Sequence, residues 1–396
     1  MFPISLLIVV ALGLSACTRA PGVRVPSLTW SLPEQWTAPE AVTDSLWWDG
    51  FTAAPLQELV AEALSRNSDL RAAAGRLSAA AAQAKLAGAV KFPKVDASGT
   101  GSRRRQNFVG FPSPEGASQV LSTTSTNYGV SLNVSWEIDL WGKLRSGKAA
   151  ALANFGAAEA RFRGVGLSLM AQTARTYFAA VEATRQLQLA TANLEIQEAT
   201  LRQIERRYEE GLRPALDVYL ARSNLALAKA VIEQRRRRLD LTTRQLEILL
   251  GRYPAAQFVA AAELPSVNRP VPAGLPAELL SRRPDLVEAE RRLVAASARV
   301  SEAKRALYPR LSLTGSNGKA SAELGDLLNG DFAVWSLAAN LTQPLFQGGR
   351  LRAGVKLAES GRDEAAAVFT AAVLRALLEV EGGLAADRFL AGQEVA

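Results

Sequence analysis

The 396-residue chain contains no histidine and only one cysteine. The absence of histidine removes the commonest general acid/base and the commonest metal ligand. A single cysteine cannot form an internal disulfide bond or a thiolate metal cluster. We therefore expect no catalytic residue, no metal site and no cofactor.

Long apolar runs and concentrated charge are also missing. No apolar run of ~20 residues occurs, so no helix is expected to span a membrane. Apolar residues make up 48% of the chain, and its 46 Lys and Arg are nearly balanced by 38 Asp and Glu. This high apolar content and low net charge exclude low-complexity disorder. The only basic runs are Arg103–Arg105 and Arg235–Arg238. No aromatic residues interleave with either run, so nucleic acid is not an expected partner.

The N-terminus reads as a targeting segment. Ile4 to Leu14 is uncharged and mostly apolar, and it leads through Ser15 and Ala16 to the lone Cys17. One interpretation is a signal peptide with an incidental cysteine. The other is a bacterial lipobox cleaved before Cys17, which then carries acyl chains such as palmitate. The lone thiol at this place favours the lipobox, with a signal peptide over 1–16 and a lipidated extended segment over 17–54.

The chain repeats itself after this segment. Residues 59–99 align with 275–315 without a gap, so that Asp69-Leu70 corresponds to Asp285-Leu286. The segment Gly142–Arg145 likewise matches Gly349–Arg352. These matches predict a duplicated unit of helix, strand, loop, strand and long helix. The repeats are expected over 55–250 and 275–396, joined by a linker over 251–274.

The expected helices are long and carry heptad patterns. No proline occurs between residues 143 and 209, a length of helix of roughly 100 Å. Gly211 is expected to end this helix and Pro214 to open the next one. The two helices form an antiparallel coiled coil, because each carries apolar residues seven apart. The seams are Leu187, Leu194, Leu201 and Tyr208, and Val218, Leu225, Ile232, Leu239 and Leu246.

Two segments alternate strictly between apolar and polar residues, which is typical of strands. From Tyr128 to Ile138 one face is apolar and the other is polar, and Trp335 to Leu341 repeats the pattern. Their partner strands begin near Val95 and Leu311, with polar loops over about 105–127 and 317–332. A half-buried hairpin and a transmembrane barrel strand share this pattern. Four strands cannot close a membrane barrel, whose smallest forms have eight, but strands pooled from several copies could.

Several local motifs now resemble one family. Arg282-Arg283-Pro284-Asp285-Leu286, followed by Tyr308–Gly315, resembles a helix-to-strand passage, and Gln343–Arg350 resembles a strand-to-helix passage. Arg207–Gly211 with Leu216-Asp217-Val218 resembles a periplasmic helical tip. Together with the lipobox and the duplication, these motifs are similar to the TolC/OprM-like outer-membrane factors, specifically the NodT-type lipoproteins of tripartite efflux systems.

The resemblance implies an α+β fold, mainly α. Long antiparallel coiled-coil helices would form a periplasmic tunnel, and four strands from each chain of a homotrimer would form a twelve-stranded outer-membrane β-barrel. The implied function is a passive export duct, not an enzyme, which works with a periplasmic adaptor protein and an inner-membrane pump. It would sit in the bacterial outer membrane, in contact with its lipid, and extend into the periplasm.

The resemblance also assigns residues. The tip would contact the adaptor, and three side chains would face the barrel lumen, where the two carboxylates favour cations. At the tip, the alternative is that Gly211 and Pro214 merely cap and turn the chain. The expected tip residues are Arg207, Tyr208, Gly211, Leu212 and Asp217, and the expected lumen residues are Asn133, Glu137 and Asp139.

One departure from the family concerns the second repeat. Family members continue past the second long helix into a second tip and a returning helix, whereas this sequence ends at Ala396. The expectation from this departure is a truncated product that assembles poorly and does not support efflux.

Two functions from other classes compete with the channel. A coiled-coil lipoprotein acting as a scaffold or adaptor explains the heptads and Cys17, but not the alternating strands. A hydrolase with paired carboxylates has only scattered Asp and Glu and no motif.

The lipobox leads to a direct test. Substitution Cys17→Ser should abolish labelling by a radioactive fatty acid, because no other thiol exists to accept it. Membrane association should survive, since barrel strands hold the protein independently of the lipid. Complete release of the variant into the soluble fraction would contradict the barrel assignment.

Overall fold

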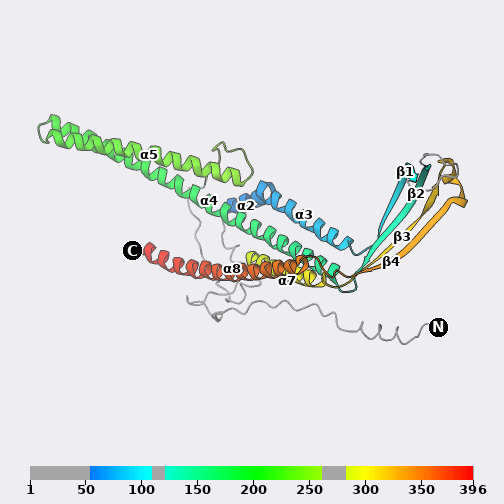
Figure 1. Ribbon diagram of the computed structural model, residues 1–396. Coiled ribbons are helices and arrows are strands. Elements are labelled where there is room, and N and C mark those ends of the chain that lie inside the picture. Colours follow the sequence, from blue (N-terminus) through cyan, green and yellow to red (C-terminus); the bar gives the residue numbers. More distant parts are fainter. Residues whose placement is uncertain (1–53, 109–120, 261–281, 396) are drawn as a thin grey trace. The chain divides into compact units, whose positions relative to one another are not determined.

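The computed structural model describes residues 54–108, 121–260 and 282–395 (Figure 1). It confirms the mainly helical α+β class and the 67-residue helix expected over 143–209. The signal peptide, Cys17 and most of the expected linker lie outside the described residues. The helices are α2 (Ala54–Arg66), α3 (Ser68–Ala89), α4 (Lys143–Glu209), α5 (Ala215–Leu249), α7 (Pro284–Arg305) and α8 (Arg350–Val395). The strands are β1 (Lys94–Phe108), β2 (Leu121–Ile138), β3 (Arg310–Ser321) and β4 (Ala333–Thr342), with two 3-10 turns, η3 (Gly325–Leu328) and η4 (Gly330–Phe332).

The sequence repeat appears as a repeated element order. Helix, strand, strand and helix follow one another as α3-β1-β2-α4 and again as α7-β3-β4-α8. Gly142 and Gly349, which occupy equivalent places in the repeat, both have a φ of +81°. Each accepts a hydrogen bond of 2.9 Å from the backbone N–H four residues on, at the start of α4 and α8. Glycine is required there because other residues rarely adopt positive φ.

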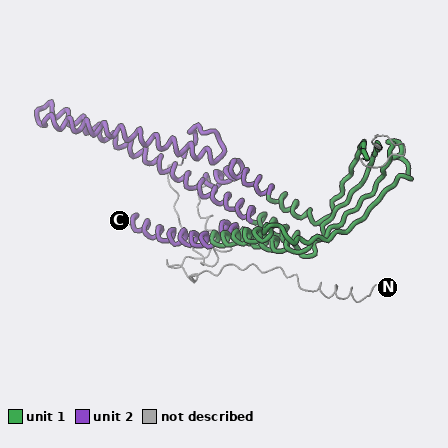
Figure 2. The backbone as a smooth tube through the Cα atoms, viewed as in Figure 1, with its two compact units in different colours: residues 1–27, 80–156, 290–369 green, residues 28–79, 157–289, 370–396 purple. Residues whose placement is uncertain are grey.

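The chain divides into two units, each containing segments from both repeats (Figure 2). The first unit comprises residues 80–156 and 290–369 and contains the four strands. Within the described chain, the second comprises 54–79, 157–260, 282–289 and 370–395 and contains the α4/α5 hairpin.

The strands of the first unit form one antiparallel sheet in the order β1-β2-β3-β4. The register pairs Val95 with Val134, Trp136 with Leu313, and Leu311 with Leu341. The expected loop over 105–127 was too long, because β1 continues to Phe108 and β2 already begins at Leu121. The loop expected over 317–332 was also too long. Strand β3 extends to Ser321, and the connection contains η3 and η4. The missed strand ends are rich in polar residues on both faces, so the alternation of apolar and polar residues that predicts a strand does not extend into them.

The core of the second unit lies where α2 meets the middle of α4 and the end of α5. Tyr177 of α4 is 2% exposed, and its ring lies 5.5 Å from that of Phe178 and 6.4 Å from that of Phe258. The fully or nearly buried residues of this core are Leu56, Leu59, Val60, Ala63, Leu169, Ala174, Tyr177, Val181, Leu246 and Leu250.

Helices α2 and α3 are separated at the buried Asn67. The Asn67 side-chain oxygen accepts hydrogen bonds from the N–H groups of Asp69, at 2.9 Å, and Leu70, at 3.1 Å. The amide nitrogen donates to the Leu249 carbonyl at 3.1 Å. Asn67 therefore caps α3 and ties it to the end of α5, because it satisfies orphan groups of both helices.

The predicted coiled coil between α4 and α5 is confirmed along most of its seam. Val218, Ile232 and Leu246 are buried, and the intervening seam leucines are half-buried. The prediction fails at Tyr208, which is 47% exposed. This residue lies in the last turn of α4, and α5 begins only at Ala215, so no opposite turn covers it.

A buried carboxylate folds the chain back after α5. Glu247, 3% exposed, accepts hydrogen bonds from the backbone N–H groups of Ala256 and Gln257 at 2.7 Å and of Phe258 at 3.2 Å. Burial by itself raises the pKa of Glu247, but the three N–H donors outweigh it and lower the pKa. The ionised carboxylate thus fastens the segment that carries Phe258 onto the core.

Substitution Glu247→Gln should lower the stability of the second unit by about 1–3 kcal/mol, because a neutral amide cannot replace a carboxylate that accepts three N–H groups. The folded pKa lies below the unfolded one, so the ionised Glu247 stabilises the fold above about pH 4.3 and loses its effect as the pH falls further. Thermal unfolding from pH 7 to pH 3 should show a smaller acid loss in the variant. An identical acid loss in both proteins would contradict this role.

Candidate functional site

The α4/α5 tip is built by a helix cap that the sequence expectation located correctly. Gly211 has a φ of +77°, and its N–H donates to the Tyr208 carbonyl at 2.9 Å. The Leu212 N–H donates to the Arg207 carbonyl at 2.8 Å. These two bonds form a Schellman motif, so the role of Gly211 in ending α4 is conformational. Pro214 occupies the N-cap of α5, one residue before the helical position expected for it.

The charged side chains of the tip are paired within the hairpin. Asp217 lies in the first turn of α5 and accepts a hydrogen bond of 3.0 Å from Arg213. Arg222 of α5 binds Glu205 of α4 through two nitrogens, at 3.1 and 2.8 Å. Exposed ion pairs of this kind contribute only about 0–1 kcal/mol, so they set orientation more than stability.

The tip also exposes apolar side chains, some of which the sequence reasoning missed. Tyr208 and Leu212 belong to the expected set, and Leu212 is 68% exposed. Leu216, Tyr219 and Leu220 of the first turns of α5 are exposed as well. The sequence could have indicated these three residues, because they are large apolar residues that lie outside the α5 seam. The hairpin turn places these three side chains at the same end of the α4/α5 pair as Tyr208 and Leu212.

The sheet has one apolar and one polar face. Because paired residues share a face, the register places Val134 beside Val95, and Leu132 beside Ala97. In β2 the apolar face is the more exposed one, with Leu132 at 56%, whereas Asn133 on the other face is half-buried. All ten residues of β4 are exposed. A half-buried hairpin on a soluble core would bury its apolar face, whereas none of the apolar residues described in the four strands is buried, which counts against that interpretation.

The polar face carries a small hydrogen-bond network around Asn133. Its amide nitrogen donates to the Ser98 hydroxyl at 2.9 Å and to the Ser131 hydroxyl at 3.2 Å. The two hydroxyls lie 3.0 Å apart across β1 and β2. Asn133 therefore lies on the face that the sequence analysis assigned to a lumen.

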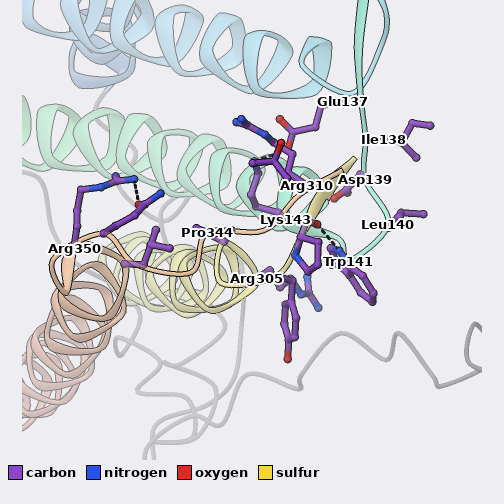
Figure 3. A pocket seen from close by; sticks show the side chains of 16 residues that line it. Glu137, Ile138, Asp139, Leu140, Trp141, Lys143, Arg305, Arg310, Pro344 and Arg350 are labelled. Carbon is purple, nitrogen blue, oxygen red and sulfur yellow. Dashed lines mark hydrogen bonds and ion pairs between the residues drawn. The ribbon is translucent and has the colours of Figure 1, made fainter. Parts of the chain in front are cut away.

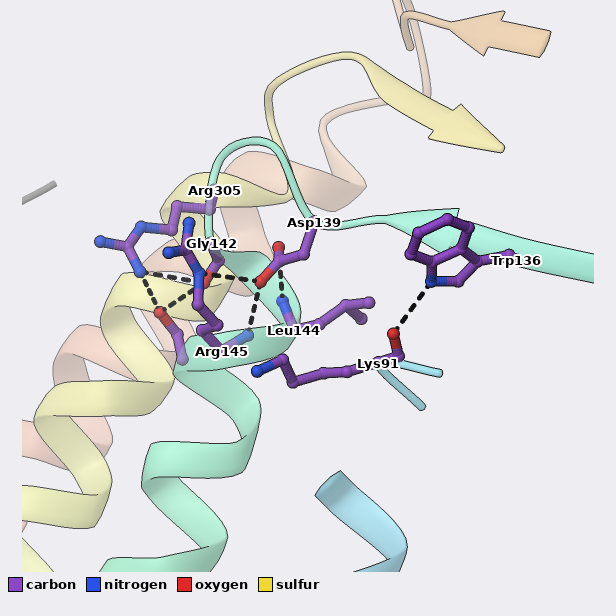
Figure 4. A network of polar contacts seen from close by, with 8 residues as sticks. Lys91, Trp136, Asp139, Gly142, Leu144, Arg145 and Arg305 are labelled. Atoms are coloured by element: carbon purple, nitrogen blue, oxygen red, sulfur yellow. Dashed lines mark hydrogen bonds and ion pairs between the residues drawn. The ribbon is translucent and has the colours of Figure 1, made fainter. Parts of the chain in front are cut away.

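The two carboxylates expected beside Asn133 have local partners. Glu137 accepts a hydrogen bond of 2.5 Å from Lys143. Asp139 lies beyond the last residue of β2, and its oxygens accept from the backbone N–H groups of Leu144 at 3.1 Å and Arg145 at 2.9 Å (Figure 4). Asp139 thus caps α4, and the Arg145 side chain contacts it as well, at 3.3 Å. Each carboxylate is matched by one cation, so together they add no net charge to this end of the sheet.

A cavity of about 350 Å³ lies at this strand-to-helix junction (Figure 3). Its wall includes Glu137, Asp139 and Lys143 from the first repeat and Arg305, Arg310 and Arg350 from the second. Polar and apolar side chains both line this cavity, which lies where the two repeats meet. Two of its cations have partners in the wall: Lys143 donates to Glu137, and Arg350 donates to Gln347.

The same junction joins the two repeats. The Trp141 indole N–H donates to the Pro309 carbonyl at 2.7 Å, and its ring lies 5.5 Å from that of Tyr308. Arg305 donates to the Gly142 carbonyl at 3.0 Å and to the Ser146 hydroxyl. The Trp136 indole N–H donates to the Lys91 carbonyl at 2.9 Å (Figure 4). Aromatic rings that are partly exposed beside cations are typical of a membrane–water interface.

Chemistry-bearing clusters are few. Within the described ranges, no group of three or more Cys, Asp and Glu residues could hold a metal ion. None of the helices in the described part of the chain is long and apolar enough to cross a membrane.

Comparison with known proteins agrees with this geometry. The family model described as outer membrane efflux protein matches residues 59–252 and 275–393. The outer membrane protein OprJ of Pseudomonas aeruginosa is 34% identical over 98% of this chain and 81% of its own length. The pyoverdine export outer membrane protein OpmQ of Pseudomonas putida is 33% identical over 96% and 81%. The crystal structure of the CmeC outer membrane channel of Campylobacter jejuni superposes with a TM-score of 0.85, at 26% identity, over 95% of this chain and 81% of that one.

Proposed function

Because the chain belongs to the outer membrane efflux protein family and is the outer-membrane channel component of an efflux system, we propose that it acts as a passive duct for small molecules across the periplasm and the outer membrane. In this role the protein supplies no energy and makes or breaks no bond in its cargo. The lipid on Cys17 and the outer-membrane location that it implies are part of this proposal.

The observation that carries the proposal is that the apolar face of the sheet is not buried: none of the apolar residues described in the four strands belongs to the core. An apolar face left open in this way suits strands with lipid outside and water inside. Four strands are too few for a membrane barrel, and both β1 and β4 have an unpaired edge within the described sheet. Three copies would pair these edges and close a twelve-stranded barrel, so we propose a homotrimer. A scaffold or adaptor lipoprotein needs no such face.

On the polar side, Asn133, Ser98 and Ser131 would line the lumen of this barrel. Their hydroxyl and amide groups bind water and carry no charge, which suits the passage of varied solutes. We propose that Glu137 also faces this lumen and that Asp139 borders it. Because Lys143 and Arg145 neutralise the two carboxylates, we expect little preference for cations from them. The inner-membrane pump, rather than this duct, would then select the cargo. The relative OpmQ is named for the export of pyoverdine, which would be one cargo of such a duct.

The two faces can be tested with neighbouring substitutions. Leu132→Arg places a charge against lipid and should cost about 2–4 kcal/mol near the bilayer midplane. Asn133→Arg places the same charge toward water and should cost much less. The measurement is the fraction of heat-modifiable, detergent-extracted oligomer in outer-membrane preparations. Equal loss of oligomer in the two variants would contradict the assignment of the faces.

We further propose that the α4/α5 tip binds the periplasmic adaptor protein. The tip residues Arg207, Tyr208, Gly211, Leu212 and Asp217 lie on or beside one turn, and exposed apolar side chains surround them. Exposed aromatic and leucine side chains on a rigid turn suit a protein partner, because docking would bury them without reordering the backbone. The paired Asp217 and Arg213 would border this contact.

The adaptor contact can be separated from the capping role of Gly211. Tyr208→Ala and Leu212→Ala should each weaken adaptor binding by about tenfold or more, as expected for buried anchors. Leu227→Ala is the control and should leave adaptor binding unchanged, because Leu227 is an exposed leucine of α5 that lies outside both the tip and the seam. Titration of purified adaptor against the detergent-solubilised oligomer gives the affinities, and thermal unfolding shows that all variants remain folded. Unchanged affinity in both alanine variants would contradict the contact.

A further inference from the structure

The arginine run of β1 has no part in the duct described above. Arg103, Arg104 and Arg105 lie in the second half of β1, beyond Gly101, and all three are exposed. They pair in register with Thr126, Ser125 and Thr124 of β2. Three consecutive arginines in a strand cannot share a face, so the run must be divided between the two sides of the sheet.

Arg103 and Arg105 lie on the apolar face. They follow Val95, Ala97, Gly99 and Gly101 at intervals of two, and Arg104 follows the polar Ser98, Thr100 and Ser102. The Arg105 guanidinium donates to the Ser122 hydroxyl at 3.0 Å. Ser122 pairs with Asn107, which is also on the apolar face, so the contact agrees with this parity.

The apolar face carries cations without carboxylates. By register, Lys319 of β3 also lies on it, opposite Val130, and its amine donates to the Leu328 carbonyl at 3.1 Å. The only carboxylates in the described strands are Asp96 and Glu137, and both lie on the polar face. Within the described residues, neither Arg103 nor Arg105 forms an ion pair.

The two arginines also lie at a suitable depth. Gly101 is paired with Tyr128, and the next residue on this face is Arg103. Val95 to Arg103 spans nine residues and Val95 to Arg105 eleven, which is the length of about 9–11 residues that a tilted strand needs to cross a bilayer. Trp136 and Trp141 mark the end of the sheet next to the helices. Arg103 and Arg105 therefore lie near the membrane surface at the end of the sheet away from the helices, just beyond Tyr128.

We propose that Arg103 and Arg105 bind the phosphate groups of a phosphorylated glycolipid, lipopolysaccharide, in the outer leaflet. This proposal rests on the proposed function, because it requires the apolar face to contact lipid. Arginine binds phosphate oxygens through paired N–H groups, and a lipid-facing cation next to the headgroups meets phosphate without leaving the strand. Arg104, on the lumen side, takes no part in this contact.

The experiment compares R103A/R105A with R104A in the full chain. Each protein is purified in non-ionic detergent and titrated with purified lipopolysaccharide. We expect binding by the wild-type chain and by R104A within about threefold of each other, and binding by R103A/R105A weaker by about tenfold or more. Binding should also weaken as salt is raised, because the contact lies at an exposed surface. Lipopolysaccharide with its phosphates removed should bind all three proteins equally weakly.

The outcomes separate this site from the duct itself. Heat-modifiable oligomer is measured for each protein before titration. If the wild-type chain forms no such oligomer in lipid, both the barrel and this site are wrong. If it forms the oligomer but R104A and R103A/R105A bind lipopolysaccharide equally, only the site is wrong. Equal competition by inorganic phosphate, or by phosphatidylglycerol vesicles, would assign the arginines to a general anion contact and would overturn the glycolipid proposal.

Discussion

The exposed apolar face of the sheet is the constraint on which the rest of this protein depends. Leu132, Trp335 and Leu337 point from a sheet whose other face holds the hydrogen-bonded Asn133. Packing on a soluble core would bury such a face, which is why we propose that it contacts lipid. Lipid in turn forbids open strand edges, because an unpaired backbone N–H or carbonyl group costs several kcal/mol there. In the proposed barrel, the four strands of one chain would therefore pair with the strands of further copies.

The junction between strands and helices keeps the two repeats in register at the edge of that sheet. Trp141 reaches the backbone of the second repeat, and Arg305 reaches back to Gly142 in the first. Asp139 caps α4 directly after β2 ends, so the change from strand to helix takes only a few residues. Asp139, which the family resemblance assigned to the lumen, is one of these contacts, because its carboxylate caps a helix.

In the α4/α5 hairpin, the residues that hold the fold differ from those that are available to a partner. Its backbone is fixed by the Schellman motif at Gly211 and by the seam that includes Val218 and Ile232. Its outward side chains, including Leu212, make no contribution to that seam. A partner can therefore use them without altering the fold of the hairpin. At the other end of α5, the buried Glu247 fixes the following segment by accepting hydrogen bonds from its backbone N–H groups.

The sequence by itself determined the helices, the duplication and the faces of the strands, because each depends on periodicity along one segment. It located the turn at Gly211, since positive φ selects glycine locally. It missed the strand ends near Phe108 and Leu121, where the residues on both faces are polar and alternation carries no signal. It also missed the local partners of Glu137 and Asp139, because β2 ends and α4 begins within the few residues that separate them. Only the tertiary structure decided the contacts of Trp141 with Pro309 and of Asn67 with Leu249, and the exposure of Tyr208. Each of these depends on which segment lies opposite, and turns and sheet pairing bring that segment there from a distant part of the chain.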